Sequence, residues 1–352
     1  MQRIGITAFL TAALLLCAGA VSASAEMPQQ GKLLFHHYSS YSAMDSKLLL
    51  HDFGTGKTQS IADDAFIHAM NADFGSHCYD IVFMAIDPVA DEWDIYRCNT
   101  ISGKLVNLTE NSGFRNEDPK FSPDGNRIVF KRGHWDTQAD GFVYDLAEMD
   151  LRTGEITMLT DSKAEESMPF YAPDGKSIYY SEILNGETSI CRLDLPSGEC
   201  AVVYTESGVQ SYYPMLSDAG LYFTKWRSAG LRNDCIVKME ENAPVMLPFN
   251  HVDYNCSDPF PLVDGSLFFS STKQGSYDLY FYDGEQEYAL TALSTSEEEL
   301  GASYFGKKDA EKIIAKTTDH LLCREKSGMN MDADGNGVVN AFDLALLKKM
   351  AG

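Results

Sequence analysis

Short apolar runs alternate with turn residues along most of the chain, and one such pattern recurs six times. A Pro or Ala is followed two residues later by an aromatic or apolar residue, then by a turn and a second apolar run. The clearest copy is Pro119-Lys120-Phe121, with a turn over 122–125 and an apolar run over 127–130. The marker Pro or Ala stands at positions 72, 119, 169, 214, 259 and 302, so the copies are 43 to 50 residues apart. A fixed period of this length indicates a repeated supersecondary unit.

Each unit continues with a third apolar run, a turn containing Gly, and a short fourth run. In the first full unit these are residues 94–97, 102–104 and 105–108. Pro presets φ for a turn, Asp hydrogen-bonds the turn backbone, and Gly accepts positive φ. Four short antiparallel strands per unit, without helical periodicity between them, predict an all-β fold: a β-propeller of four-stranded blades.

The two ends of the repeat region are predicted to complete one blade together. Residues 31–61 read as a unit without its first strand, and residues 301–305 read as a first strand without its unit. Pairing them would close the ring and remove its sheet edges. This arrangement gives six blades over residues 31–318; a further strand-like run at 312–316 keeps seven blades as an alternative.

Composition narrows the class of partner. The 352 residues contain 51 Asp and Glu against 28 Lys and Arg, a net charge of −23. Nucleic acid is not expected as a partner, because phosphate binding needs clustered Lys and Arg. Docking on an anionic lipid surface is disfavoured for the same reason.

The first 25 residues predict a secretory signal peptide. Arg3 provides the positive charge, residues 6–21 are apolar, and Ala23-Ser24-Ala25 matches a cleavage site near Ala25. No later run is long and apolar enough to span a bilayer, so no membrane insertion is expected. The protein is therefore expected to be secreted, either free or associated with a cell surface.

Seven cysteines would remain after cleavage. Cys191 with Cys200, Cys78 with Cys98, and Cys235 with Cys256 could pair, which would leave Cys323 over. Buried free thiols are the equally weighted alternative.

The repeat carries a family resemblance. Residues 121–130, with the sequence FSPDGNRIVF, are similar to the repeat of TolB-like propellers within the wider WD-like class. The resemblance covers about residues 31–318. This chain lacks the N-terminal α/β domain of TolB, so the partners of TolB are not carried over.

The last residues, 329–352, do not follow the propeller repeat, and an expected linker at 319–328 precedes them. Acidic and amide side chains fall at loop positions 1, 3, 5, 9 and 12, with Gly at position 6 and a backbone carbonyl at position 7. Hard oxygen ligands at this spacing are typical of a Ca²⁺ loop. The predicted ligands are Asp332, Asp334, Asn336, Val338, Asn340 and Asp343.

This loop and the following apolar run resemble one F-hand of a type I dockerin. The resemblance implies a cohesin-like or other cell-surface protein as partner, with Lys348 and Lys349 at the contacting positions. Only one such loop is found, whereas a dockerin has two.

A ligand-binding face is predicted where the loops between second and third strands converge. These loops are equivalent in every blade, and all three tryptophans lie in or beside them. Aromatic rings with nearby polar groups can stack on a polysaccharide or hold a protein ligand. The alternative is that each Trp packs between blades. The candidate residues are Tyr38, Tyr41, Trp93, His134, Trp135, Trp226, Arg227 and Tyr277.

No catalytic motif stands out, so no catalytic residue is predicted. G-x-S-x-G and H-E-x-x-H are absent from the sequence. His36 and His37 are adjacent, and neighbours on a strand point to opposite faces, which disfavours one shared metal. We therefore expect a non-catalytic binding propeller, tethered through its C-terminal repeat to a cell-surface or cellulosome-like assembly for polysaccharide degradation. The alternative is a propeller enzyme such as a polysaccharide lyase.

Overall fold

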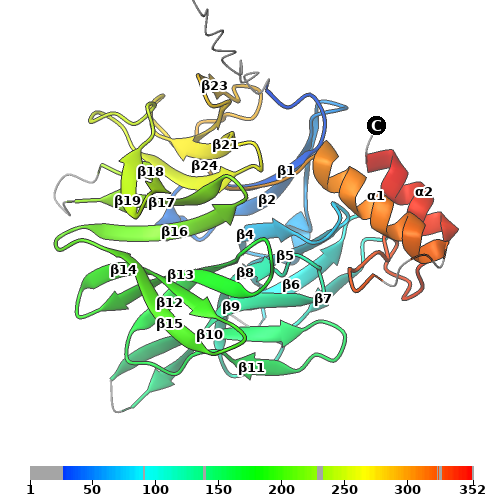
Figure 1. Ribbon diagram of the computed structural model, residues 1–352, viewed down its shortest axis with the longest axis horizontal. Coiled ribbons are helices and arrows are strands. Elements are labelled where there is room, and N and C mark those ends of the chain that lie inside the picture. Colours follow the sequence, from blue (N-terminus) through cyan, green and yellow to red (C-terminus); the bar gives the residue numbers. More distant parts are fainter. Residues whose placement is uncertain are drawn as a thin grey trace, which may run out of the picture.

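Six four-stranded antiparallel sheets stand around a central axis in the computed structural model (Figure 1). The structure describes residues 27–89, 92–137, 140–227, 233–322, 324 and 327–350. The predicted signal peptide and Cys323 lie outside these residues. The all-β, six-bladed prediction is confirmed.

The blades follow the chain in order. Blade 1 contains β24 (Glu298–Phe305), β1 (Lys32–Tyr38), β2 (Lys47–Asp52) and β3 (Lys57–Ser60), and blade 2 contains β4 (His68–Phe74), β5 (Asp80–Ile86), β6 (Asp94–Asn99) and β7 (Leu105–Asn107). Blade 3 contains β8 (Arg115–Phe121), β9 (Arg127–Asp136), β10 (Gly141–Asp150) and β11 (Ile156–Met158), and blade 4 contains β12 (Glu165–Tyr171), β13 (Ser177–Leu184), β14 (Glu187–Asp194) and β15 (Glu199–Thr205). Blade 5 contains β16 (Gln210–Ser217), β17 (Gly220–Trp226), β18 (Cys235–Glu240) and β19 (Ala243–Met246), and blade 6 contains β20 (Cys256–Pro261), β21 (Leu267–Ser271), β22 (Asp278–Tyr282) and β23 (Glu287–Ala289).

Blade 1 is assembled from both ends of the repeat region, as the sequence predicts. The last strand, β24, pairs antiparallel with β1, with Lys32 opposite Phe305 and Tyr38 opposite Glu298. The seven-bladed alternative is wrong, because residues 312–316 belong to helix α1 (Lys307–Leu321). The ring is therefore closed by pairing of distant segments.

The repeated Pro or Ala marks a bulge in the innermost strand of each blade. The residue before the marker is left-handed in all six strands, and the ladder to the second strand shifts register there. A left-handed non-Gly residue costs roughly 1–2 kcal/mol, so the surrounding blade must hold it. These bulge residues are Asn71, Asp118, Met168, Tyr213, Asp258 and Gly301, with φ between 52° and 67°.

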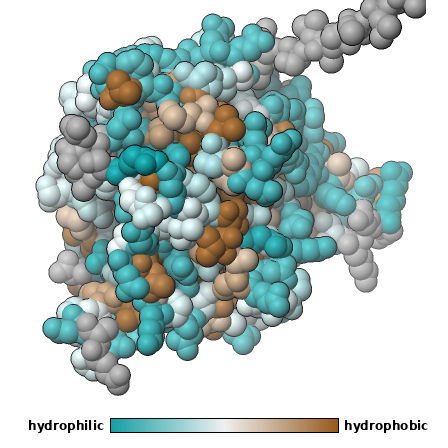
Figure 2. All heavy atoms as spheres, turned by 60° about the vertical axis from the view of Figure 1, so that its left-hand side comes forward, coloured by the Kyte–Doolittle hydropathy of each residue, from teal (hydrophilic) through white to brown (hydrophobic). Residues whose placement is uncertain are grey.

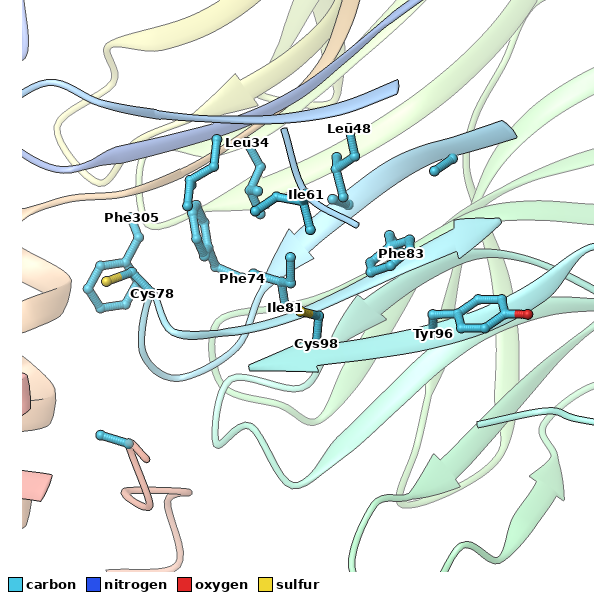
Figure 3. Packing of buried hydrophobic residues seen from close by; sticks show 14 of the residues in the cluster. Leu34, Leu48, Ile61, Phe74, Cys78, Ile81, Phe83, Tyr96, Cys98 and Phe305 are labelled. Atoms are coloured by element: carbon cyan, nitrogen blue, oxygen red, sulfur yellow. The ribbon is translucent and has the colours of Figure 1, made fainter. Parts of the chain in front are cut away.

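Apolar side chains between neighbouring blades form the core. Leu34 and Leu48 from blade 1 pack with Ile81 and Phe83 from blade 2 in the largest cluster. Figure 3 shows that Phe74, Cys78 and Phe305 extend this cluster to one end of the sheets. The same cluster continues into the C-terminal helices through Ile313 and Leu347.

The six described cysteines are free, so the suggested pairings are not formed. Register explains this: Cys200 lies opposite Leu193 rather than Cys191, and Cys98 lies opposite Ile81 rather than Cys78. Burial raises the pKa of Cys78, Cys191 and Cys256 to about 12 in each case. These thiols are therefore held in the unreactive protonated form.

Two helices follow the propeller, and their extent corrects the predicted boundaries. Strand β24 ends the propeller at Phe305, whereas the predicted propeller extended to residue 318. Helix α1 occupies residues 307–318 of that predicted propeller and the first three residues of the predicted linker, 319–321. Ala310, Ile313 and Thr317 form the buried stripe of α1, a helical spacing that a strand interpretation misses. Helix α2 (Ala341–Met350) begins within the acidic loop (residues 332–343) and packs beside α1 (Figure 1). Within the described residues, no helix is both long and apolar enough for a membrane crossing.

Candidate functional site

Two opposite ends of the propeller carry different chemistry. Connections alternate between ends in an antiparallel blade, so all links between second and third strands emerge at one end, which we call the loop face. The other end carries turns such as those between β4 and β5 and between β8 and β9. The C-terminal segment (residues 327–350) contacts this second end, which we call the docked face. Figure 1 shows α1 and α2 beside this end, on the right of the view.

The longest hairpin of the ring stands on the loop face. Strands β9 and β10 each have ten residues, and Trp135 pairs with Phe142 near their tip. The two rings meet edge to face, with centroids 5.5 Å apart, and their exposed fractions are 55% and 46%. Phe142 also stacks on Tyr144 at 5.7 Å. Trp135, Phe142 and Tyr144 form a surface that we call the aromatic platform.

The platform depends on a glycine beneath it. Gly133 pairs with Tyr144, and a Cβ at Gly133 would lie 2.3 Å from the Tyr144 ring. The ammonium of Lys131 lies 3.9 Å from the centroid of the Tyr144 ring and also 2.7 Å from Glu165 Oε1. The Tyr144 ring is therefore held flat on the hairpin between a glycine and a cation.

The other predicted loop-face residues do not form one surface. Trp93 is buried, at 4% exposure, and packs against His68 with centroids 4.9 Å apart. The structure thus corrects this candidate: Trp93 is a core residue between strands. Tyr38 is half-buried over His36, whereas Tyr41 is exposed at its edge.

The remaining candidates lie apart from the platform or on its reverse side. His134 is exposed and meets Phe114 edge to face on the opposite side of the hairpin. Arg227 forms an ion pair with Glu206, and Trp226 is half-buried in blade 5. Tyr277 donates to Asp234 Oδ2 at 3.2 Å. Figure 2 turns the loop face, the left-hand side of Figure 1, toward the reader and shows separate hydrophobic patches among hydrophilic residues.

Phe142 and Tyr144 were not among the sequence candidates. They lie in the third strand rather than in the loop, so a search restricted to loops passes over them. Counting residues back from the hairpin tip on both strands would pair Phe142 with Trp135. Directly paired residues lie on the same face of the hairpin, so this count would have added Phe142 to the candidates.

The acidic loop brings three predicted ligands together. The carboxylate oxygens of Asp332, Asp334 and Asp343 lie within 4.8 Å of one another. Asp343 is fully buried and accepts the Ala333 N–H at 2.9 Å and the Asn340 N–H at 2.7 Å. Gly335 and Gly337 have positive φ, as the tight turn requires.

The amide and carbonyl candidates of this loop line its other side. Asn336 Nδ2 donates to Asp334 Oδ2 at 2.8 Å, and Asn340 Nδ2 donates to the Val338 carbonyl at 3.2 Å. Asn340 Oδ1 also accepts the Phe342 N–H at 2.7 Å at the start of α2. A set of carboxylate, amide and backbone oxygens fits Ca²⁺, which takes six to eight oxygen ligands. The acidic loop is therefore a possible metal site.

The C-terminal segment is attached to blades 2 and 3. Asn99 donates to the Ala333 carbonyl at 3.1 Å, Tyr79 donates to the Leu346 carbonyl at 3.3 Å, and the Asn330 N–H donates to the Asp124 carbonyl at 2.8 Å. Met331, Ala333, Leu346 and Leu347 are buried in the cluster shared with the propeller. The segment is therefore part of the packed body of the protein.

Lys348 and Lys349, the candidate partner-contacting residues, are both exposed on α2. Phe342 and Val338 are exposed near the start of this helix, at 58% and 61%. The outward side of the segment thus remains accessible while its inward side is covered.

The adjacent histidines do not share a site. His36 is buried beside Gly301 and Asn71, and burial lowers its pKa to about 3. His37 instead lies 2.8 Å from Glu297 Oε2. Within the described residues, the three aspartates of the acidic loop are the single group of three or more His, Cys, Asp or Glu ligands close enough for one ion.

Comparison with known proteins shows the fold. No family model matches the chain. TolB from Acinetobacter baumannii is similar in structure, with a TM-score of 0.62 over 80% of this chain and 68% of that chain, at 16% identity. Hydrazine synthase from Kuenenia stuttgartiensis gives a TM-score of 0.64 over 80% of this chain and 47% of that one, at 13% identity. The chain therefore has a TolB-like propeller fold.

Sequence similarity to curated proteins covers a smaller region. A segment of 110 residues is 33% identical to dipeptidyl-peptidase 5 of Porphyromonas gingivalis, which is 30% of this chain and 16% of that protein. The chain thus matches only a small part of the length of this relative.

Proposed function

We propose that this protein is an exported, non-catalytic binding propeller that takes a polysaccharide or protein ligand on its loop face. We further propose that the acidic loop binds Ca²⁺ and that the C-terminal segment tethers the protein to a cohesin-like or other cell-surface partner. The observation that carries the proposal is the aromatic platform, an exposed pair of rings built onto an extended, internally supported hairpin. Large exposed aromatic surfaces commonly mark binding sites.

The arrangement of the two ends supports simultaneous use of both surfaces. The platform lies on the loop face, and Lys348 and Lys349 lie on α2 beyond the opposite end. A ligand on the platform would therefore not compete for space with a partner on α2. The net charge of −23 favours a neutral or cationic ligand over an anionic one.

Binding to the platform is testable with the full chain. Affinity electrophoresis against neutral and acidic polysaccharides should detect a ligand, and Trp135→Ala with Phe142→Ala should weaken binding about ten-fold or more, because stacking on both rings is lost. Met246→Ala, an exposed apolar residue on the outer strand of blade 5, is the matched control and should change nothing. Unsaturated products from a polyuronate with Mn²⁺ or Ca²⁺ would contradict the non-catalytic proposal and favour a lyase.

Calcium binding has its own measurement. Titration calorimetry of the full chain should show one Ca²⁺ site, and Asp332→Ala should abolish the heat, because Asp332 is one of the three converging carboxylates. Glu311→Ala, which removes an exposed acid from α1, should leave the heat unchanged. Equal heats from Asp332→Ala and the wild type would refute the site.

The tether is tested by capture on cohesin-bearing scaffold fragments. Wild-type protein should be retained in Ca²⁺ and released by EDTA, and Lys348→Ala with Lys349→Ala should reduce retention. Loss of retention with intact Ca²⁺ binding would place the partner contact on these lysines. No retention in Ca²⁺ would overturn the tether and leave the platform proposal standing.

A further inference from the structure

The central channel has an uneven lining just beyond the bulges. Two residues after each bulge residue, the inner strands contribute a ring of side chains that line two neighbouring cavities. Blades 1 to 3 contribute Ser303, Asp73 and Lys120, whereas blades 4 to 6 contribute Phe170, Met215 and Phe260. One half of the channel wall is therefore polar and charged, and the facing half is apolar.

The larger of these cavities opens toward the docked face and has a volume of about 270 Å³. Inner-strand residues of all six blades line it, and Asp309 and Lys312 of α1 border it. This volume is just below the range of roughly 300–1,000 Å³ common for small-molecule sites. Its aromatic lining includes Phe170 and Phe260 on one side of the channel and Phe74 on the other.

Asp73 and Ser303 lie on the polar wall of the larger cavity, and Lys120, which lines the smaller cavity, lies beside Asp73. Asp73 is buried, at 7% exposure, and its carboxylate accepts the Phe121 N–H at 2.9 Å and the Ser303 hydroxyl at 3.0 Å. Lys120 Nζ lies 3.9 Å from Asp73 Oδ1, which is too long for a hydrogen bond. A hydroxyl oxygen placed beside both atoms could accept from Lys120 and donate to Asp73, since a hydroxyl does both.

We propose that this cavity binds a neutral pyranose sugar, with a C–H face of the ring on Phe170 and Phe260 and adjacent hydroxyls on Asp73 and Lys120. Asp73, Asp218 and Asp309 line this cavity against one lysine, Lys312, so an anionic ligand would face net repulsion. A sugar ring combines an apolar face with a polar edge, which matches the divided wall. This site is separate from the platform and from the acidic loop.

Desolvation supports the same assignment. Burial raises the pKa of Asp73 even though it accepts two hydrogen bonds, so one more hydrogen-bond donor would stabilise its charged form. A donating hydroxyl would supply one. The phenyl rings opposite would lose contact with water as the sugar enters, which adds a favourable hydrophobic contribution.

The test uses the full chain and a panel of methyl glycosides of glucose, galactose and xylose. Saturation-transfer NMR should show transfer to ring protons of at least one glycoside, and titration should give a dissociation constant. Asp73→Asn should weaken this binding roughly ten-fold or more, because a hydrogen bond to a charged group is lost. Lys120→Met is the second variant, and Met246→Ala on the outer strand of blade 5 is the matched control.

Thermal melts of each variant distinguish misfolding from lost binding, and Lys120→Met keeps the test valid if Asp73→Asn fails to fold. No saturable binding of any glycoside would overturn the proposal. So would stronger binding of free leucine than of every glycoside, or equal loss of sugar binding in Met246→Ala. Because polysaccharide capture on the platform is measured with Phe142→Ala and Trp135→Ala, the two proposals can fail separately.

Discussion

The two ends of the propeller use the same repeat for different purposes. On the loop face, the β9–β10 hairpin extends its rings into solvent, with Trp135 more than half exposed. On the docked face, the turns of blades 2 and 3 are covered by the C-terminal segment, and Leu347 and Ala333 are fully buried there. Substitutions on the loop face can therefore alter ligand binding with little loss of stability, whereas substitutions at the buried contacts of the docked face lower the free energy of unfolding.

The largest expected effect lies on the docked face. Leu347→Ala should lower the free energy of unfolding by about 2–5 kcal/mol, because a fully buried side chain is removed from a shared core. Chemical denaturation measures this, with Lys348→Ala on the exposed side of α2 as control. A change below about 0.5 kcal/mol would mean that the segment does not contribute to the fold.

The next effect depends on pH and lies between blades 3 and 4, just beneath the loop face. Burial, with a smaller contribution from nearby Asp145 and Glu182, raises the pKa of Glu166 to about 7. The folded protein therefore holds a proton that the unfolded chain releases above its ordinary pKa of 4.5. Stability should fall as pH rises from about 4.5 to 7.

Glu166→Gln removes this proton linkage and keeps an acceptor for the Thr160 hydroxyl. It should be more stable than the wild type at pH 8 by up to about 3 kcal/mol, since one pKa unit corresponds to about 1.4 kcal/mol. The two proteins should melt at similar temperatures near pH 4. Parallel melting curves across this whole range would show that Glu166 does not titrate there.

A smaller effect is expected where the loop face depends on packing. Gly133→Ala should destabilise by about 1–3 kcal/mol and displace Tyr144, because the added Cβ overlaps its ring. Ligand binding on the platform should weaken as well. Gly328→Ala is the control, since a Cβ there meets nothing within 4 Å.

The smallest stability effect is expected at the exposed end of the platform. Trp135→Ala should change the free energy of unfolding by less than about 1 kcal/mol, because more than half of the side chain is already in water. It should still reduce ligand binding. A loss of several kcal/mol would remove the contrast between the two ends and make the platform a structural feature.

The regular spacing of Pro and Ala predicted the propeller, its closure and six blades, with seven blades kept as the alternative. The reason is local: each marker follows a left-handed bulge residue, and most markers precede a turn that contains Gly. The acidic loop was readable for the same reason, since its ligands lie within 12 consecutive residues. Features that depend on the backbone of a few consecutive residues can therefore be recognised from residue types and spacing.

Contacts between segments that are distant in the sequence could not be recognised in this way. The sequence did not show that α1 replaces a seventh-blade strand, that Trp93 packs on His68, or that Asn99 holds the acidic loop to blade 2. Each depends on which surfaces meet when the ring closes. The sequence by itself determined the repeat, the blades and the convergence of oxygen ligands, because these arise within short stretches of chain. The tertiary structure alone decided which aromatic rings are exposed and which loops are covered, because burial is a property of the assembled surface.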